Sequence, residues 1–255
     1  MTKKKVRKKK KATPIFRNIT LTLTLLLGGL LLAFYLKKAP SEKQTFSELG
    51  TFVIRGIDLS HHNAIPEPRK LKNEGVSFVY MKATEGTDHL DRNYQLNYRL
   101  LKDAGIRTGA YHFYTFGVSG KRQAAHFIKT ARMQSQDMIP AIDVEHSPVN
   151  PYSRDTAYVA KVIRELKALE DELYRYYGKK PIIYTNKNCY QLYIEKHFPD
   201  NLLWFADLHN QPSAELQNWR IWQFSHQGKV AGVDGKVDLN YYRYNLKEFD
   251  EMLLP

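Results

Sequence analysis

The chain has a single cysteine among its 255 residues. One thiol permits no disulfide within the chain, so the fold must be stabilised by its core rather than by cross-links. Cys189 lies in the segment Tyr-Thr-Asn-Lys-Asn-Cys-Tyr, which does not show the histidine and asparagine pattern of a catalytic thiol, and we expect it to be a buried structural side chain. No cysteine follows the apolar run near the N-terminus, which excludes a lipid-modified cysteine there.

Acidic residues are absent from the first 38 positions, although the whole chain has a net charge of +13. Those positions hold 11 lysines and arginines, which leaves 28 basic against 26 acidic residues in the rest of the chain. A nearly neutral remainder lacks the basic surface that DNA or RNA binding requires, so we expect no nucleic-acid partner. The excess charge belongs to the N-terminus.

The N-terminal segment has the pattern of a membrane anchor. Residues 19–36 form an uncharged, leucine-rich run that is long enough to cross the hydrocarbon core of a bilayer as a helix. We expect a basic tail at 1–17, a transmembrane helix at 18–36 in contact with the lipid bilayer, and a polar linker at 37–52. A cleaved signal peptide is the alternative, but the run is long for one, and Lys37 occupies the −3 position for cleavage after Ala39.

The charge pattern also predicts the orientation. Basic residues crowd the N-terminal side of the run, so the positive-inside rule places the N-terminus in the cytoplasm. We therefore expect a single-pass membrane protein whose residues 53–255 form a monomeric domain in the periplasm or outside the cell. Nothing in residues 1–51 is expected to contribute to that domain.

Short β runs alternate with helical spacers from residue 53 onward. The candidate strands are residues 53–58, 77–83, 107–114, 139–145, 181–185, 202–206, 220–224 and 235–240. Apolar residues at helical spacing mark 66–73, 94–103, 121–134 and 156–177. This alternation predicts parallel strands joined by right-handed crossovers. We expect an α/β fold, a TIM-like (β/α) barrel of eight strands with reduced helices after the fifth strand.

Carboxylates fall where these strands end. Asp143 and Glu145 lie two residues apart on the fourth candidate strand, so their side chains leave the same face. Neighbouring acids raise each other's pKa, and a protonated acid beside an ionised one is suited to cleaving a glycosidic bond. Asp58 ends the first strand and Asp238 lies in the last, and these strands are neighbours once the barrel closes. In a parallel barrel the chemistry gathers at the C-terminal ends of the strands, so we expect all four acids at one mouth.

Eight short motifs surround these acids in a fixed order. They are Arg-Gly-Ile-Asp58-Leu-Ser, Val-Tyr-Met-Lys82-Ala-Thr-Glu85-Gly, Gly109-Ala-Tyr111-His112-Phe113-Tyr114, Ile-Asp143-Val-Glu145, Ile-Tyr184-Thr-Asn186, Leu-Trp204-Phe-Ala, Trp222-Gln223-Phe and Val-Asp238-Leu-Asn240. In this order and spacing the chain resembles glycoside hydrolase family 25, the Chalaropsis-type lysozymes. The resemblance covers residues 53–255.

The resemblance implies N-acetylmuramidase activity, the hydrolysis of the β-1,4 bond between N-acetylmuramic acid and N-acetylglucosamine in peptidoglycan. The partner would then be a peptidoglycan glycan strand. By position Glu145 matches the general acid, Asp143 the carboxylate that assists it and Asp58 the acid ending the first strand, with Asp238 as a substrate contact. Two alternatives remain for the second step of the reaction. Either a carboxylate attacks the sugar directly, or the substrate's own 2-acetamido group does so with Asp143 orienting it.

Aromatic side chains near the predicted strand ends are candidates for a sugar-binding platform, because their flat faces match those of pyranose rings. The candidate substrate contacts are Tyr111, Tyr114, Tyr184, Trp204, Trp222 and Gln223. Core packing is the alternative role for each aromatic residue.

Two further classes of site find little support. Four histidines near the predicted mouth lack the spacing of a zinc motif, and no phosphate-binding loop is present, so we expect no metal and no cofactor. These histidines are His61, His62, His112 and His146. A catalytically weak peptidoglycan-binding module is one alternative to the enzyme, but such a module would be expected to lose one of the acids, and none is missing. An anchored scaffold is another, but it would not need the acids and aromatic residues at one mouth.

Overall fold

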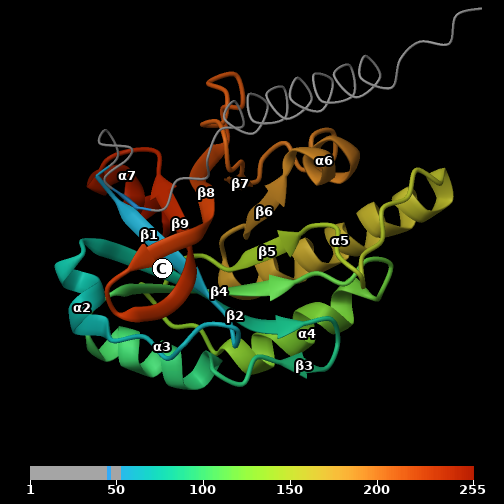
Figure 1. Cartoon of the computed structure of the whole chain (residues 1–255). Coiled ribbons are helices and arrows are strands. Elements are labelled where there is room, and N and C mark those ends of the chain that lie inside the picture. Colours follow the sequence, from blue (N-terminus) through green and yellow to red (C-terminus); the bar gives the residue numbers. More distant parts are fainter. Residues whose placement is uncertain (1–44, 47–52) are drawn as a thin grey trace, which may run out of the picture. The chain divides into compact units, whose positions relative to one another are not determined.

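The computed structural model describes residues 45–46 and 53–255 (Figure 1). The predicted basic tail and transmembrane helix lie outside the described residues. Among the residues that are described, no helix is both long and apolar enough to span a membrane.

Eight strands of the described part close into a barrel. They are β1 (Arg55–Leu59), β2 (Val76–Glu85), β4 (Arg107–Phe113), β5 (Ala141–Val144), β6 (Ile182–Asn186), β7 (Leu203–Ala206), β8 (Trp219–Val230) and β9 (Val233–Tyr242). Pairing of β1 with both β9 and β2 closes the barrel. The short β3 (His89–Leu90) pairs only with the edge of β2. The predicted eight-stranded α/β barrel is confirmed.

The last strand differs from the prediction of a parallel sheet. The barrel strands β1, β2 and β4 to β8 run parallel to one another, whereas β9 is antiparallel to both β8 and β1. Only Ala231 and Gly232 separate β8 from β9. Two residues cannot form a crossover connection, so the two strands must form a hairpin. Gly232 supplies the positive φ of 104° that the turn requires.

Helices cover the outside of the first half of the barrel (Figure 1). They are α2 (Pro68–Asn73), α3 (Tyr94–Asp103), α4 (Gly120–Ala131) and α5 (Thr156–Tyr177). The longest, α5, begins after Asp155, whose side chain accepts a hydrogen bond from the Tyr158 backbone N–H, and it ends at Gly178 with φ 74°. Its buried face carries Leu166 and Leu169.

Regular helices become short after β6, as predicted. The connections that follow contain only α6 (Lys187–Cys189), the π-helical turn η2 (Tyr190–Ile194), α7 (Leu246–Phe249) and the 3₁₀ turn η3 (Asp250–Met252). The mouth on this side is therefore built from loops and from the β8–β9 hairpin.

Phe46 contradicts the expectation that nothing before residue 52 contributes to the domain. Its side chain is 5% exposed. The ring lies 5.6 Å from that of Tyr241 and 6.2 Å from that of Phe224, centroid to centroid. The Tyr241 hydroxyl donates a hydrogen bond to the Phe46 carbonyl oxygen. Part of the predicted linker thus packs into the core.

Aromatic rings of β2 fill the barrel beneath the mouth. A Cβ at Gly56 would lie 2.2 Å from the Phe78 ring, and a Cβ at Gly109 would lie 2.3 Å from the Tyr80 ring. Glycine is therefore required on the strands that flank β2. The Tyr80 ring also lies 4.9 Å from that of Trp204, between centroids. These rings form a closed floor, so the mouth is a pocket and not a channel.

Candidate active site

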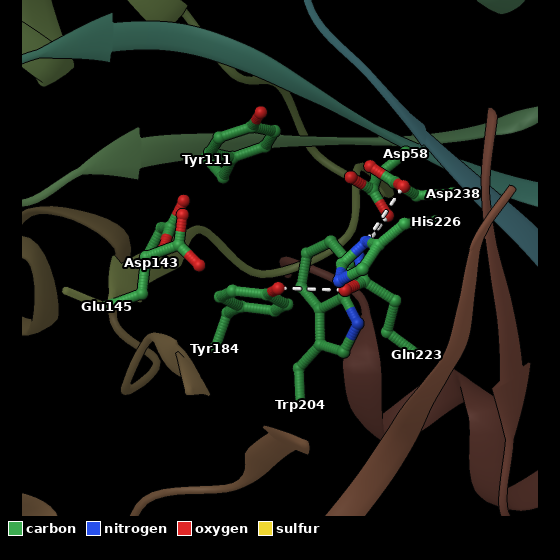
Figure 2. A pocket seen from close by; sticks show the side chains of 9 residues that line it. All are labelled: Asp58, Tyr111, Asp143, Glu145, Tyr184, Trp204, Gln223, His226 and Asp238. Carbon is green, nitrogen blue, oxygen red and sulfur yellow. Dashed lines mark hydrogen bonds and ion pairs between the residues drawn. The ribbon is translucent and has the colours of Figure 1, made fainter. Parts of the chain in front are cut away.

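A pocket of about 220 Å³ lies at the mouth of the barrel (Figure 2). Its lining comes from seven of the eight barrel strands and the loop after β5: Asp58, Tyr111, Asp143, Glu145, Tyr184, Trp204, Gln223, His226 and Asp238. The predicted convergence of the four acids is confirmed. Carboxylates that are up to 180 residues apart in the sequence therefore share one cavity.

Asp143 and Glu145 lie together on one side of the pocket (Figure 2). Asp143 belongs to β5 and is 7% exposed, whereas Glu145 follows the strand and is partly buried. Burial is the main cause that raises the pKa of both acids, and the charge of Glu145 raises the pKa of Asp143 further. Both carboxyls therefore hold a proton more readily than free acids do.

Lys82 places a positive charge near Asp143 and Glu145. Its ammonium forms an ion pair with Glu85 at 2.6 Å. It also lies 4.8 Å from the centre of the Phe113 ring. Its charge lowers the pKa of Asp143 and Glu145 against the larger opposite effect of burial.

One oxygen of Asp143 is unsatisfied. Among the described residues, Oδ1 of Asp143 is buried without a hydrogen-bond partner. Buried polar atoms are nearly always hydrogen-bonded, so an exception needs an explanation. Because Asp143 lines the pocket, a donor on a bound ligand can supply the missing bond.

Asp58 lies on the opposite side and is held by two amides. Its Oδ2 accepts hydrogen bonds from Nε2 of Gln223 at 2.9 Å and from Nδ2 of Asn240 at 2.8 Å. Burial raises the pKa of Asp58 most, the charge of Asp238 raises it further, and the two amides lower it. Gln223 also accepts a hydrogen bond from the Tyr184 hydroxyl at 2.7 Å. Its amide therefore fixes an acid and a tyrosine at once.

Three aromatic rings form a wall of the pocket (Figure 2). The Trp204 indole N–H donates to Oδ1 of Asn240 at 2.7 Å, which fixes the plane of the ring. The Tyr184 and Tyr111 rings stand at 76° and 86° to that of Trp204, with centroids 5.0 and 6.5 Å away. All three rings line the pocket, and their role as a sugar platform stays a prediction.

Two predicted substrate contacts lie elsewhere. Tyr114 is fully buried, and its hydroxyl donates to the Val162 carbonyl oxygen on α5 at 2.8 Å. The indole N–H of Trp222 donates to the Asp207 carbonyl oxygen at 2.7 Å, and the ring is 1% exposed. Side chains alternate along a strand. Tyr114 thus faces away from Tyr111, three residues earlier, and Trp222 faces away from its neighbour, the pocket residue Gln223.

His112 lies behind the sheet and not at the mouth. It contacts Oγ1 of Thr84 at 2.7 Å and Oε1 of Gln123 at 3.0 Å, and burial lowers its pKa to about 4. Within the described ranges, no group of three or more histidine, cysteine, aspartate or glutamate side chains is arranged to hold a metal ion.

Cys189 is buried, as predicted, but it has a histidine neighbour that the sequence did not reveal. Its Sγ lies 3.3 Å from Nδ1 of His146. Burial raises the pKa of the thiol to about 12, so the sulfur stays protonated and is a poor nucleophile.

His226 is the pocket residue that the sequence reasoning missed. Its Nδ1 lies 3.0 Å from Oδ1 of Asp238. The predicted strand ended at residue 224, whereas β8 continues to Val230. Register shifts on both sides of Ser225 interrupt the simple alternation of side chains. No two-residue period in the sequence could therefore place His226 beside Gln223.

Neighbouring carboxyl groups with raised pKa values, set beside aromatic rings in one pocket, are the arrangement expected of a glycoside hydrolase. The family model described as "Glycosyl hydrolases family 25" matches residues 57–233, and the chain belongs to this family. The resemblance inferred from the motifs is thereby confirmed.

Individual relatives agree with the family. The chain is 31% identical over 209 residues to "Uncharacterized protein YegX" of Escherichia coli K12, which covers 78% of this chain and 72% of that protein. It is 30% identical over 220 residues to "Lysozyme M1" of Streptomyces globisporus, covering 80% and 72%. The structure of a family 25 glycosyl hydrolase from Bacillus anthracis matches with a TM-score of 0.71 and 29% identity, over 84% of this chain and 98% of that one.

Proposed function

We propose that this protein is a lysozyme that hydrolyses the β-1,4 bond between N-acetylmuramic acid and N-acetylglucosamine in peptidoglycan. The observation that carries the proposal is the pair of buried Asp143 and partly buried Glu145, which faces Asp58 across a pocket lined by aromatic rings. The relative named "Lysozyme M1" supports the same activity.

Glu145 is the general acid of this proposal. Burial raises its pKa, so the carboxyl keeps a proton that it can donate to the leaving glycosidic oxygen. Positive charge then grows at the anomeric carbon, and the negative charge shared by Asp58, Asp143 and Asp238 stabilises it. Every acid required lines the one cavity.

Asp143 serves as the acceptor for the substrate's 2-acetamido group. Its unsatisfied Oδ1 fits an amide N–H, and that bond would turn the acetamido oxygen toward the anomeric carbon. This favours attack by the substrate's own amide over direct attack by a carboxylate. One experiment distinguishes these two nucleophiles. Removing the acetyl group from the muramic acid residues of the substrate should abolish cleavage if the amide is the nucleophile, and should leave it largely intact if a carboxylate is.

The test of the activity itself is the release of reducing ends from purified peptidoglycan. The proposed lysozyme releases new reducing ends at muramic acid. A catalytically weak wall-binding module, which is the alternative, would sediment with peptidoglycan without releasing any. Mass spectrometry of the soluble fragments identifies which of the two glycosidic bonds was cut.

We also propose that residues 18–36 anchor the protein in a membrane, with the basic tail in the cytoplasm and the hydrolase domain outside it. The support is the uncharged leucine-rich run and the basic residues before it. Peptidoglycan lies on the same side as the proposed domain. Membrane fractionation with protease protection tests both points. Soluble protein whose chain starts after Ala39 would mean a cleaved signal, and a domain protected on the cytoplasmic side would refute the orientation.

A further inference from the structure

His226 reaches the pocket from the β8–β9 hairpin and lies on the side opposite Glu145 (Figure 2). In the pocket it contacts Asp238, with Nδ1 and Oδ1 3.0 Å apart. The two side chains are 45% and 35% exposed. The contact therefore lies at the rim of the pocket, where solvent screens it in part.

The charges around His226 come from three elements. Asp238 belongs to β9, Asp58 to β1, and Glu145 follows β5. Lys82, on β2, is the other cation that acts on Glu145. His226 is thus a cation, when protonated, within a set of carboxylates that the proposed reaction uses.

His226 and Asp238 act on the same acids with opposite signs. Burial is the largest cause that raises the pKa of Glu145 and of Asp58. The carboxylate of Asp238 raises both pKa values further, and the positive charge of His226 lowers both. When the two side chains are paired, these effects offset each other.

On the basis of the function proposed above, we propose that His226 is a positioning residue that holds Asp238 at the rim and sets the pH range in which the hydrolase works. The imidazolium offsets the charge of Asp238, a carboxylate that acts on both Glu145 and Asp58, so its presence changes the pH at which these two acids lose their protons. Within the part of the chain that the structure describes, no other cationic side chain forms an ion pair with Asp238.

The sign of the effect follows from the mechanism. Glu145 must be protonated to act, so the rate falls on the alkaline side as it loses its proton. Asp58 must be ionised to stabilise positive charge, so the rate falls on the acid side as it gains one. His226→Gln removes the positive charge but keeps an N–H donor for Asp238. Both acids then hold their protons to higher pH, and both limbs of the profile move upward together.

The size of the shift follows from the exposure of the pair. Partly exposed ion pairs are weak, so the relative rate of His226→Gln on the alkaline limb should exceed that of the wild type by roughly 1.5- to 5-fold. On the acid limb it should be lower by a similar factor. A purely structural role would lower the rate by one factor at every pH.

The experiment measures kcat/KM against pH on purified peptidoglycan with the full-length chain. The variants are His226→Gln, His226→Ala, Asp238→Asn and the double variant His226→Gln/Asp238→Asn. Asp238→Asn should move both limbs downward and lower the maximal rate, because its charge stabilises the positive charge of the reaction. The limbs of the double variant should return to pH values close to those of the wild type, while its maximal rate stays low. His226→Ala should shift like His226→Gln and also lose maximal rate, because nothing then holds Asp238. Unshifted limbs in folded His226→Gln would overturn the proposal.

A second measurement decides the proposal without hydrolysis. The carboxyl carbon-13 signal of Glu145, followed against pH, should titrate at higher pH in His226→Gln than in the wild type. An unchanged midpoint would overturn the role of His226 even in an active enzyme. A protein that releases no reducing ends would refute the proposed function, while this titration would still decide whether His226 sets the charge at Glu145.

Discussion

Replacing Asp143 with asparagine should stabilise the fold while it destroys the function. Asp143 is buried, and one of its oxygens has no partner among the described residues. A buried polar group left unsatisfied costs about 1–3 kcal/mol, and more when it is charged. Asp143→Asn keeps the shape and removes the charge, so it should recover a substantial part of this free energy at neutral pH.

The gain should depend on pH, and the pKa shift gives its sign. Burial raises the pKa of Asp143 in the folded protein above its unfolded value. Below the unfolded value the carboxyl is protonated in both states, and the wild type pays no cost for a buried charge. The wild type loses stability as the pH rises from the unfolded pKa through the folded one. The advantage of Asp143→Asn should therefore be small at acid pH and full at neutral pH.

Thermal unfolding at several pH values checks this prediction. For a domain of about 200 residues, 1–3 kcal/mol corresponds to a rise in Tm of roughly 2–10 °C. Asp88→Asn, at an exposed position, is the matched control and should show no such pH-dependent gain. Lower stability of Asp143→Asn at neutral pH, or a gain that does not change with pH, would refute the reasoning about the buried carboxyl.

Three further substitutions test individual contacts. Phe46→Ala should lower the free energy of unfolding by about 2–4 kcal/mol in urea titrations, because the ring is buried in the core; a neutral effect would show that residues before 52 do not contribute. Gln223→Ala should lower kcat/KM by roughly 10- to 100-fold, with the fold kept, because it frees Asp58. Tyr114→Phe should cost about 1 kcal/mol of stability through the lost bond to Val162 and leave kcat/KM unchanged, and a loss of activity would return Tyr114 to the substrate site.

The sequence predicts the first half of the fold better than the second. The bounds of α3 and α5 match the predicted ranges 94–103 and 156–177, because apolar periodicity and the terminal glycines act locally. The β8–β9 hairpin was not predicted, because its strands of 12 and 10 residues extend well beyond the predicted ranges 220–224 and 235–240. The partly exposed ends of these strands carry no alternating pattern.

Some residues of the candidate site could be predicted from the sequence, and others could not. The acids could be predicted to meet, because closure of a barrel brings strand ends together whatever their separation in the sequence. Tyr114 and Trp222 were misplaced although strand parity alone assigns them to the other face. No sequence pattern predicted that His226 lines the pocket, since the direction of its side chain depends on the irregular register of the β8–β9 hairpin.

The central claim is that Glu145 donates the proton that breaks the glycosidic bond. The most direct measurement is the rate of reducing-end release from peptidoglycan by Glu145→Gln, whose amide keeps the shape of the side chain and has no acidic proton. Its fold is checked by thermal unfolding, and Glu195→Gln, at an exposed position, is the matched control. The account predicts a loss of at least about 10²-fold in kcat/KM for Glu145→Gln and none for the control. Wild-type turnover by a folded Glu145→Gln protein would contradict it.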